Sequence, residues 1–172
     1  MDEAAKRTGD GDGHPSQTEN SAGSIAGEAK LRASQIRVLI VEDSSIIRER
    51  LAALISNLPN VVIVGLAEDG FKARALFRQH RPDAVVLDIQ LPGINGMDLL
   101  AEFKQEQPAC VVMVLTTYGF KEFRQRCADL GADYFFNKHN EFERVKEVLA
   151  KFEGSRGFKS ENPDVPRRKD VP

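Results

Sequence analysis

Short apolar runs alternate with segments of helical spacing, and this alternation restricts the fold more than any other feature of the sequence. The runs are Ile36–Val41, Val61–Ala67, Ala84–Leu87, Val111–Leu115 and Tyr134–Phe136. They are rich in β-branched residues and nearly continuous, which is typical of strands that are covered on both faces.

The segments between these runs carry apolar residues three and four positions apart, as the buried face of a helix does. The stripes are Ile47, Leu51, Leu54, Ile55 and Leu58; Ala73, Leu76 and Phe77; Met97, Leu100 and Phe103; Phe120, Phe123, Cys127 and Leu130; and Phe142, Val145, Leu149 and Phe152. The pattern predicts an α/β fold, a doubly wound five-stranded parallel sheet with helices on both faces.

The two ends of the 172-residue chain differ from this middle part. Residues 1–34 and 154–172 are poor in large apolar side chains, so burial would not offset the entropy of ordering them. We therefore predict a disordered N-terminal tail, one domain over residues 35–153 and a flexible C-terminal tail.

Charge and hydropathy exclude several classes of function. The net charge of −2 lacks the basic footprint of a nucleic-acid-binding protein. Because no run of about 18 apolar residues and no secretory signal is present, we expect a cytoplasmic protein without a membrane partner. Cys110 and Cys127 lack metal-ligand spacing and are expected to be buried free thiols.

Chemically active side chains come directly after four of the five predicted strands. Glu42 and Asp43 follow the first strand, Asp88 the third, Thr116 and Thr117 end the fourth, and Lys138 follows the fifth. The carboxyl ends of parallel strands meet at one edge of a sheet, where ligands bind. The sequence therefore predicts that two acidic clusters, a hydroxyl and an ammonium converge there.

This combination suits phosphoryl transfer to a carboxylate. Neighbouring carboxylates repel one another, and Mg²⁺ relieves the repulsion. One carboxylate can attack phosphorus, while the metal, a lysine and a hydroxyl neutralise charge on the phosphoryl oxygens. A lone Asp at a strand end is commonly a helix N-cap and a lone Lys a surface charge, so it is the ordered set that favours a site.

Five stretches resemble the response-regulator receiver family, the CheY-like proteins: VLIVEDSSIIRERL, VIVGLAEDGFKA, RPDAVVLDIQLPGINGMDLL, VVMVLTTYG and LGADYFFNKHNEFERV. The resemblance extends over residues 36–152. It implies a flavodoxin-like receiver fold with strand order 2-1-3-4-5, in a stand-alone single-domain member of the family.

The resemblance also implies roles for individual residues. Asp88 would accept the phosphoryl group, and Mg²⁺ (or Mn²⁺) would be held by Glu42, Asp43, Asp88 and the backbone carbonyl of Gln90. The switch and phosphoryl contacts would be Thr116, Lys138 and the aromatic residue Phe135, which is expected to turn inward as Thr116 moves.

By the same resemblance, the phosphoryl donor is a sensor histidine kinase or a histidine phosphotransferase that docks on the helix of residues 46–58. The C-terminal segment is short and polar, so we expect signalling through protein–protein contacts with a downstream protein rather than a DNA-binding output domain. The chain would be a switch, catalysing only its own phosphorylation and dephosphorylation.

Three positions depart from the family pattern and are predicted to tune the site. His139 stands where the family usually has proline, Thr117 where a smaller residue is frequent, and Gln90 is long enough to contact a phosphoryl group or an attacking water.

Two alternatives remain open. An Asp-nucleophile phosphatase needs a second Asp two positions after the first, where this chain has Gln90. A pseudo-receiver, a binding scaffold that works without phosphorylation, is favoured by His139 but disfavoured by the complete acidic set.

Overall fold

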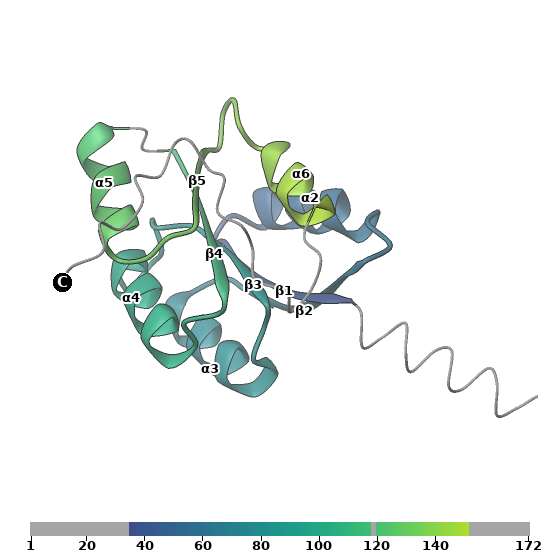
Figure 1. The fold of residues 1–172 in the computed structure, drawn as a ribbon, viewed down its shortest axis with the longest axis horizontal. Helices are drawn as coiled ribbons and strands as arrows, with labels where there is room; N and C mark the ends of the chain where they lie inside the picture. Colours follow the sequence, from purple (N-terminus) through teal and green to yellow (C-terminus); the bar gives the residue numbers. More distant parts are fainter. Residues whose placement is uncertain (1–34, 118–119, 152–172) are drawn as a thin grey trace, which may run out of the picture. The chain divides into compact units, whose positions relative to one another are not determined.

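A five-stranded parallel sheet forms the centre of the computed structural model, which describes residues 35–117 and 120–151 (Figure 1). The strands are β1 (Ile36–Val41), β2 (Val61–Ala67), β3 (Ala84–Leu87), β4 (Val111–Thr116) and β5 (Tyr134–Asn137). Their order is β2-β1-β3-β4-β5, and each neighbouring pair is parallel. The predicted topology is confirmed, and the strand bounds differ from the prediction by at most one residue.

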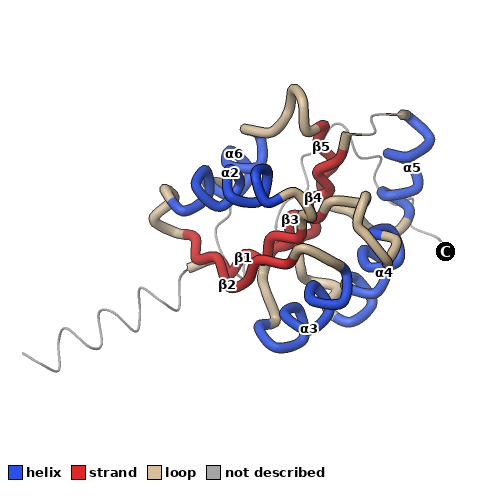
Figure 2. Tube along the Cα trace, turned by 180° about the vertical axis from the view of Figure 1, so that it is seen from behind, coloured by secondary structure: helices blue, strands red, loops and turns tan. Residues whose placement is uncertain are grey.

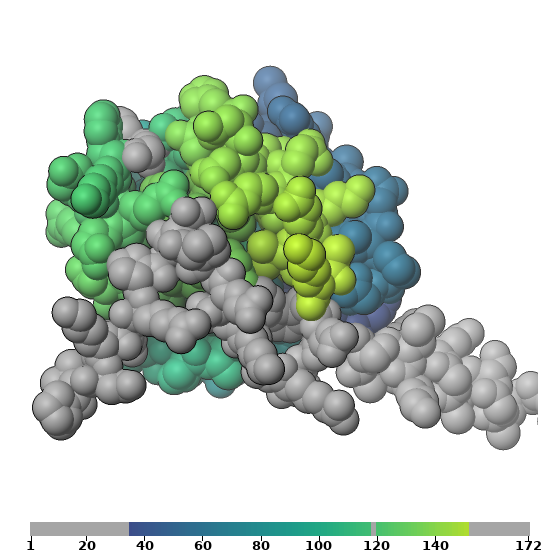
Figure 3. All heavy atoms as spheres, turned by 45° about the horizontal axis from the view of Figure 1, so that its top comes forward, coloured from purple at the N-terminus to yellow at the C-terminus, as the bar shows by residue number. Residues whose placement is uncertain are grey.

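The helices lie on both faces of the sheet, as predicted. Helices α2 (Ser45–Ser56) and α6 (Arg144–Ala150) cover one face, and α3 (Gly70–His80), α4 (Gly96–Glu106) and α5 (Lys121–Asp129) cover the other (Figures 1 and 2). Figure 3 shows α2 and α6 side by side on their face, and Arg50 of α2 lies 3.7 Å from Glu143 just before α6. In the described ranges, no helix has the length and apolar character needed to cross a membrane.

Two hydrophobic cores explain why the strands are apolar at nearly every position. Along β1, Val38 and Ile40 pack toward α2 and α6, whereas Leu39 and Val41 pack toward α3, α4 and α5. β3, β4 and β5 alternate between the two cores in the same way, whereas the edge strand β2 has Val62 and Leu66 exposed. Because a polar residue inside β3 or β4 would be buried on either face, these two strands are apolar from end to end apart from Thr116, the last residue of β4.

One predicted core residue was placed wrongly. Phe120 is the N-cap of α5 and is 65% exposed, so the buried stripe of this helix starts at Phe123. Residue spacing does not define where a helix begins, and Phe120 lies one position before the first helical residue. Leu58 lies beyond the end of α2 but is buried as predicted. The predicted tails and Phe152 lie outside the described residues.

Candidate functional site

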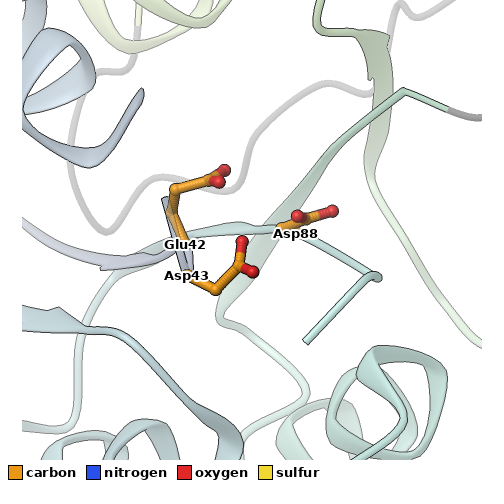
Figure 4. A group of neighbouring side chains, drawn as sticks. All are labelled: Glu42, Asp43 and Asp88. Carbon is orange, nitrogen blue, oxygen red and sulfur yellow. The ribbon is translucent and has the colours of Figure 1, made fainter. Parts of the chain in front are cut away.

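Three carboxylates from two neighbouring strands meet at the carboxyl edge of the sheet (Figure 4). Glu42 and Asp43 follow β1, and Asp88 follows β3; one carboxylate oxygen from each lies within 4.8 Å of the others. Glu42 and Asp88 are 1% and 3% exposed, whereas Asp43 is exposed. The structure therefore brings together the acidic residues that the sequence predicts.

Lys138 reaches the same cluster from the end of β5. Its Nζ donates hydrogen bonds to Asp88 Oδ2 at 2.7 Å and to Glu42 Oε1 at 3.0 Å, and its side chain is only 7% exposed. Burial alone would lower the pKa of Lys138, but the hydrogen bonds and charges of Asp88 and Glu42 outweigh burial and raise this pKa. The ammonium thus compensates two buried acids in this structure.

Glu42 combines deep burial with incomplete hydrogen bonding. Burial raises the pKa of its carboxyl group above the ordinary value, more than the hydrogen bond and charge of Lys138 lower it. Oε1 accepts from Lys138 and from the Ser44 N–H at 3.3 Å. Oε2 forms an ion pair with the same ammonium at 2.7 Å but accepts no hydrogen bond.

This buried, ion-paired oxygen and the donor set together fit a hard divalent cation. Mg²⁺ prefers carboxylate and carbonyl oxygens, and the cluster offers three carboxylates, one of which has a buried oxygen that accepts no hydrogen bond. A cation would also reduce the repulsion between Glu42 and Asp88, which contributes to the raised pKa of Glu42.

The backbone fixes Asp88 from both sides. Its N–H donates to Val41 O of β1 at 2.9 Å, and its Oδ1 accepts from the Gln90 N–H at 3.0 Å. Gly96, the first residue of α4, packs against the same segment; an added Cβ there would lie 2.5 Å from Ile89 Cα and 2.8 Å from Asp88 O. Glycine therefore allows α4 to begin directly beside the acidic residue.

Thr116 and Phe135, the predicted switch residues, lie inside the protein. Thr116 ends β4 and is fully buried, and its backbone carbonyl accepts from the Lys138 N–H at 2.9 Å. Phe135 is 1% exposed, and the guanidinium of Arg124 lies 4.9 Å from the centre of its ring. In this structure the ring therefore already occupies an inward position.

The three predicted tuning residues lie at the exposed rim of the site. Thr117 Oγ1 donates to Gln90 Oε1, which links the loop after β4 to the loop after β3. His139 is exposed, and its backbone N–H donates to Asn137 Oδ1 at 2.8 Å. Gln90 and Thr117 thus contact each other, a relationship that sequence reasoning did not predict.

Sequence reasoning also missed Arg48. Its Nη1 donates to Glu42 O at 2.7 Å and to Asp43 O at 3.2 Å. The available signal was its position four residues after the N-cap Ser44, because helical side chains point back toward the helix N-terminus.

Comparison with known proteins agrees with this geometry. The family model described as the response regulator receiver domain matches residues 38–150. The chain belongs to the response regulator receiver domain family. The receiver domain is a regulatory, non-enzymatic component of two-component systems, which supports a phosphoacceptor role for this chain.

Curated relatives share this domain within longer proteins. The chain is 37% identical over 118 residues to "Protein-glutamate methylesterase/protein-glutamine glutaminase 1" of Caulobacter vibrioides, covering 68% of this chain and 34% of that protein. It is 39% identical over 106 residues to "Protein-glutamate methylesterase/protein-glutamine glutaminase" of Paraburkholderia xenovorans, covering 60% of this chain and 29% of that protein. The chain thus spans about a third of the length of the curated relatives it matches.

Solved structures show the same fold. The receiver domain of the putative response regulator NarL from Mycobacterium tuberculosis aligns with a TM-score of 0.62 and 28% identity, covering 67% of this chain and 94% of that chain. The response regulator domain of Thermotoga maritima CheB aligns with a TM-score of 0.59 and 27% identity, covering 67% of this chain and 90% of that chain. A chain of the CheX-CheY-BeF3-Mg+2 complex from Borrelia burgdorferi aligns with a TM-score of 0.62 and 25% identity, covering 66% of this chain and 86% of that chain.

Proposed function

We propose that this receiver domain is a phosphorylation switch of a two-component or phosphorelay system in which Asp88 accepts the phosphoryl group. The observation that carries the proposal is the position of Asp88, hydrogen-bonded to Lys138 and within 4.8 Å of Glu42 and Asp43. The carboxylate proposed as the nucleophile thus lies between the ammonium of Lys138 and the carboxylates of Glu42 and Asp43, which are potential metal ligands.

Glu42, Asp43, Asp88 and the backbone carbonyl of Gln90 would hold Mg²⁺ or Mn²⁺. The buried Oε2 of Glu42, which is ion-paired with Lys138 but accepts no hydrogen bond, supports this assignment, and the similar Borrelia burgdorferi structure is named as a complex with Mg²⁺. When bound, the cation would neutralise negative charge on the carboxylates and the phosphoryl oxygens.

The phosphoryl donor would be the phosphohistidine of a sensor histidine kinase or histidine phosphotransferase. A carboxylate oxygen of Asp88 forms the new P–O bond as the P–N bond breaks, and the imidazole leaves with the electron pair of that bond. Lys138 then stabilises the added negative charge, and Thr116 supplies a hydroxyl at the adjacent strand end. Movement of Thr116 and Phe135 would carry the change to a surface read by a downstream protein.

Exposed apolar side chains near the strand ends support docking of a donor protein. Ile46, Phe71 and Phe120 are large and exposed, and each lies four or five residues after the end of β1, β2 or β4. Because Asp88 is nearly inaccessible to solvent, a phosphorylated side chain must enter over this edge, and its protein would cover these residues. The α2 helix, which contains Ile46 in its first turn, is the proposed main docking element.

The rim residues would set the lifetime of the phosphorylated state. The Gln90 N–H donates to Asp88, and the Gln90 side chain accepts from Thr117, so the linked pair would control access of water to the acyl phosphate. His139 would shape the loop after β5, where proline is usual in the family.

The names of the curated relatives describe whole proteins that are about three times as long as the matched region. The receiver family model accounts for residues 38–150 of this chain. We therefore propose the regulatory role, and not methylesterase activity, for these residues, with domain bounds of 35–153.

Phosphorylation in vitro tests the proposal. The full chain is incubated with acetyl phosphate and Mg²⁺, and intact-protein mass spectrometry is expected to show the gain of one phosphoryl group. Asp88→Asn should abolish the gain, whereas Asp98→Asn, which removes an exposed carboxylate in the first turn of α4, should retain it. A wild-type protein that gains no mass would support the dormant scaffold, and sustained hydrolysis of a phosphate ester would support the phosphatase.

A further inference from the structure

Arg48 contacts the backbone of both acidic residues that follow β1. Its side chain extends from the first turns of α2 back toward the strand end, and a single nitrogen, Nη1, donates to Glu42 O at 2.7 Å and Asp43 O at 3.2 Å. The Arg48 N–H also donates to Ser44 O at 2.9 Å. The guanidinium therefore ties the turn between β1 and α2 to the helix that follows it.

The three carboxylates of the site differ in how they are held. Asp88 is fixed by Lys138 and by the Gln90 N–H, and Glu42 by Lys138 and the Ser44 N–H. Within residues 35–117 and 120–151, the Asp43 carboxylate makes no hydrogen bond or ion pair and is exposed. Its position depends on its own backbone.

We propose that Arg48 is a positioning residue for the metal site, acting by fixing the two peptide groups that orient Asp43. This inference rests on the proposed metal-dependent phosphoacceptor function. The hydrogen bonds to Glu42 O and Asp43 O restrict rotation of the peptide groups on either side of the Asp43 Cα. A restricted backbone means that less conformational entropy is lost when a cation binds the carboxylate.

The charge of Arg48 acts in the opposite direction. A guanidinium close to the acidic pair repels a divalent cation, so removing it would strengthen metal binding if charge were the main effect. Removing it weakens metal binding if positioning is the main effect. The sign of the change in affinity therefore separates the two roles.

The experiment measures Mn²⁺ binding to the full chain from the electron paramagnetic resonance signal of free Mn²⁺, without a phosphoryl donor. Arg48→Met is expected to weaken Mn²⁺ binding about tenfold, the lower end of the range for residues that orient metal ligands without binding the metal. Arg48→Lys keeps the charge and a donor on a shorter side chain, and should fall between the wild type and Arg48→Met.

Arg50→Met is the matched control, because it removes the same charge from the same helix. Arg50 pairs with Glu143 and lies over the Phe142 ring, and it does not contact the acidic turn. Its Mn²⁺ affinity should equal that of the wild type, and circular dichroism during the titration verifies that each variant is folded.

Unchanged or tighter Mn²⁺ binding by folded Arg48→Met would overturn the role of Arg48 while leaving the metal site intact. A wild-type chain that binds no Mn²⁺ would overturn both the metal site and the positioning role. If Arg48→Met is unfolded, Arg48→Lys decides the question. Positioning by Arg48 would be refuted if Arg48→Lys binds Mn²⁺ as tightly as the wild type while Arg50→Met binds it more weakly.

Discussion

The pairing of Lys138 with two buried acids leads to a quantitative stability prediction. Lys138→Met leaves Glu42 and Asp88 without the ammonium that lies 2.7 Å from an oxygen of each. Both acids are almost fully buried, so solvent cannot replace the lost charge.

The expected cost follows from this burial. Removing one member of a buried ion pair typically destabilises a protein by about 3–5 kcal/mol. Glu42 can lower the cost by taking up a proton, because burial already raises its pKa. We therefore expect a loss of about 3 kcal/mol at neutral pH, which would be a large fraction of the 5–15 kcal/mol typical of a domain.

The pH dependence has a defined sign. A carboxyl group whose pKa is higher in the folded than in the unfolded state favours folding below its unfolded pKa, and this contribution is lost as the pH rises through the folded pKa. Without Lys138 the pKa of Glu42 rises further. The deficit of Lys138→Met should therefore be small near 4.5, the ordinary pKa of a glutamate side chain, and grow toward neutral pH.

Urea denaturation without divalent cations, followed by circular dichroism at acidic and neutral pH, measures these changes. Asp88→Asn in the Lys138→Met background should recover most of the loss, because one carboxylate remains. Lys72→Met, which breaks the exposed pair with Glu68, is the control and should change the stability far less than Lys138→Met, because water screens an exposed pair. A deficit that is independent of pH, or that persists in the double variant, would refute the charge argument.

Two further predictions concern the thiols and the rim. Burial raises the pKa of the Cys110 thiol to about 12 and that of Cys127 to about 11, so both should resist iodoacetamide at about pH 8 in the folded protein and react in urea. A thiol whose pKa is raised in the folded state favours folding fully only below the ordinary thiol pKa of 9.0, so the free energy of unfolding should fall as the pH rises above this value. Reaction of the native protein with iodoacetamide would contradict the burial of the thiols. Gln90→Ala and Thr117→Ala should each shorten the lifetime of phosphorylated Asp88 several-fold, because each breaks the same hydrogen bond. Mass spectrometry after removal of the phosphoryl donor measures this lifetime, and the double variant should show no further shortening. Opposite effects of the two substitutions would contradict a shared role.

The sheet and the acidic site were predictable because both depend on patterns with a simple period. Strands covered on both faces are continuously apolar, and the first polar residue marks the carboxyl end of each strand. Glu42 and Asp88 are such residues, Lys138 follows the polar Asn137 that ends β5, and the parallel order brings these strand ends to one edge. The resemblance to receivers gave the strand order, which periodicity alone does not determine.

The contacts that were missed depend on geometry that no period encodes. The hydrogen bonds of Arg48 require the angle at which α2 leaves β1, and the Gln90–Thr117 contact requires two loops to approach each other. The start of α5 was also misplaced, because Phe120 has the spacing of a core residue but precedes the helix. Each error concerns how a strand connects to the next helix.

The charge balance of the site bears on the proposed transfer of Lys138 from the two acids to a phosphoryl group. The formal charges of three carboxylates and one ammonium sum to two net negative charges, which a single divalent cation would neutralise. Once the cation compensates Glu42, the bond between Lys138 and Glu42 is no longer needed to offset its burial. We therefore expect metal binding to precede the transfer of Lys138 to the phosphoryl group, and phosphorylation to be strongly metal-dependent for this reason.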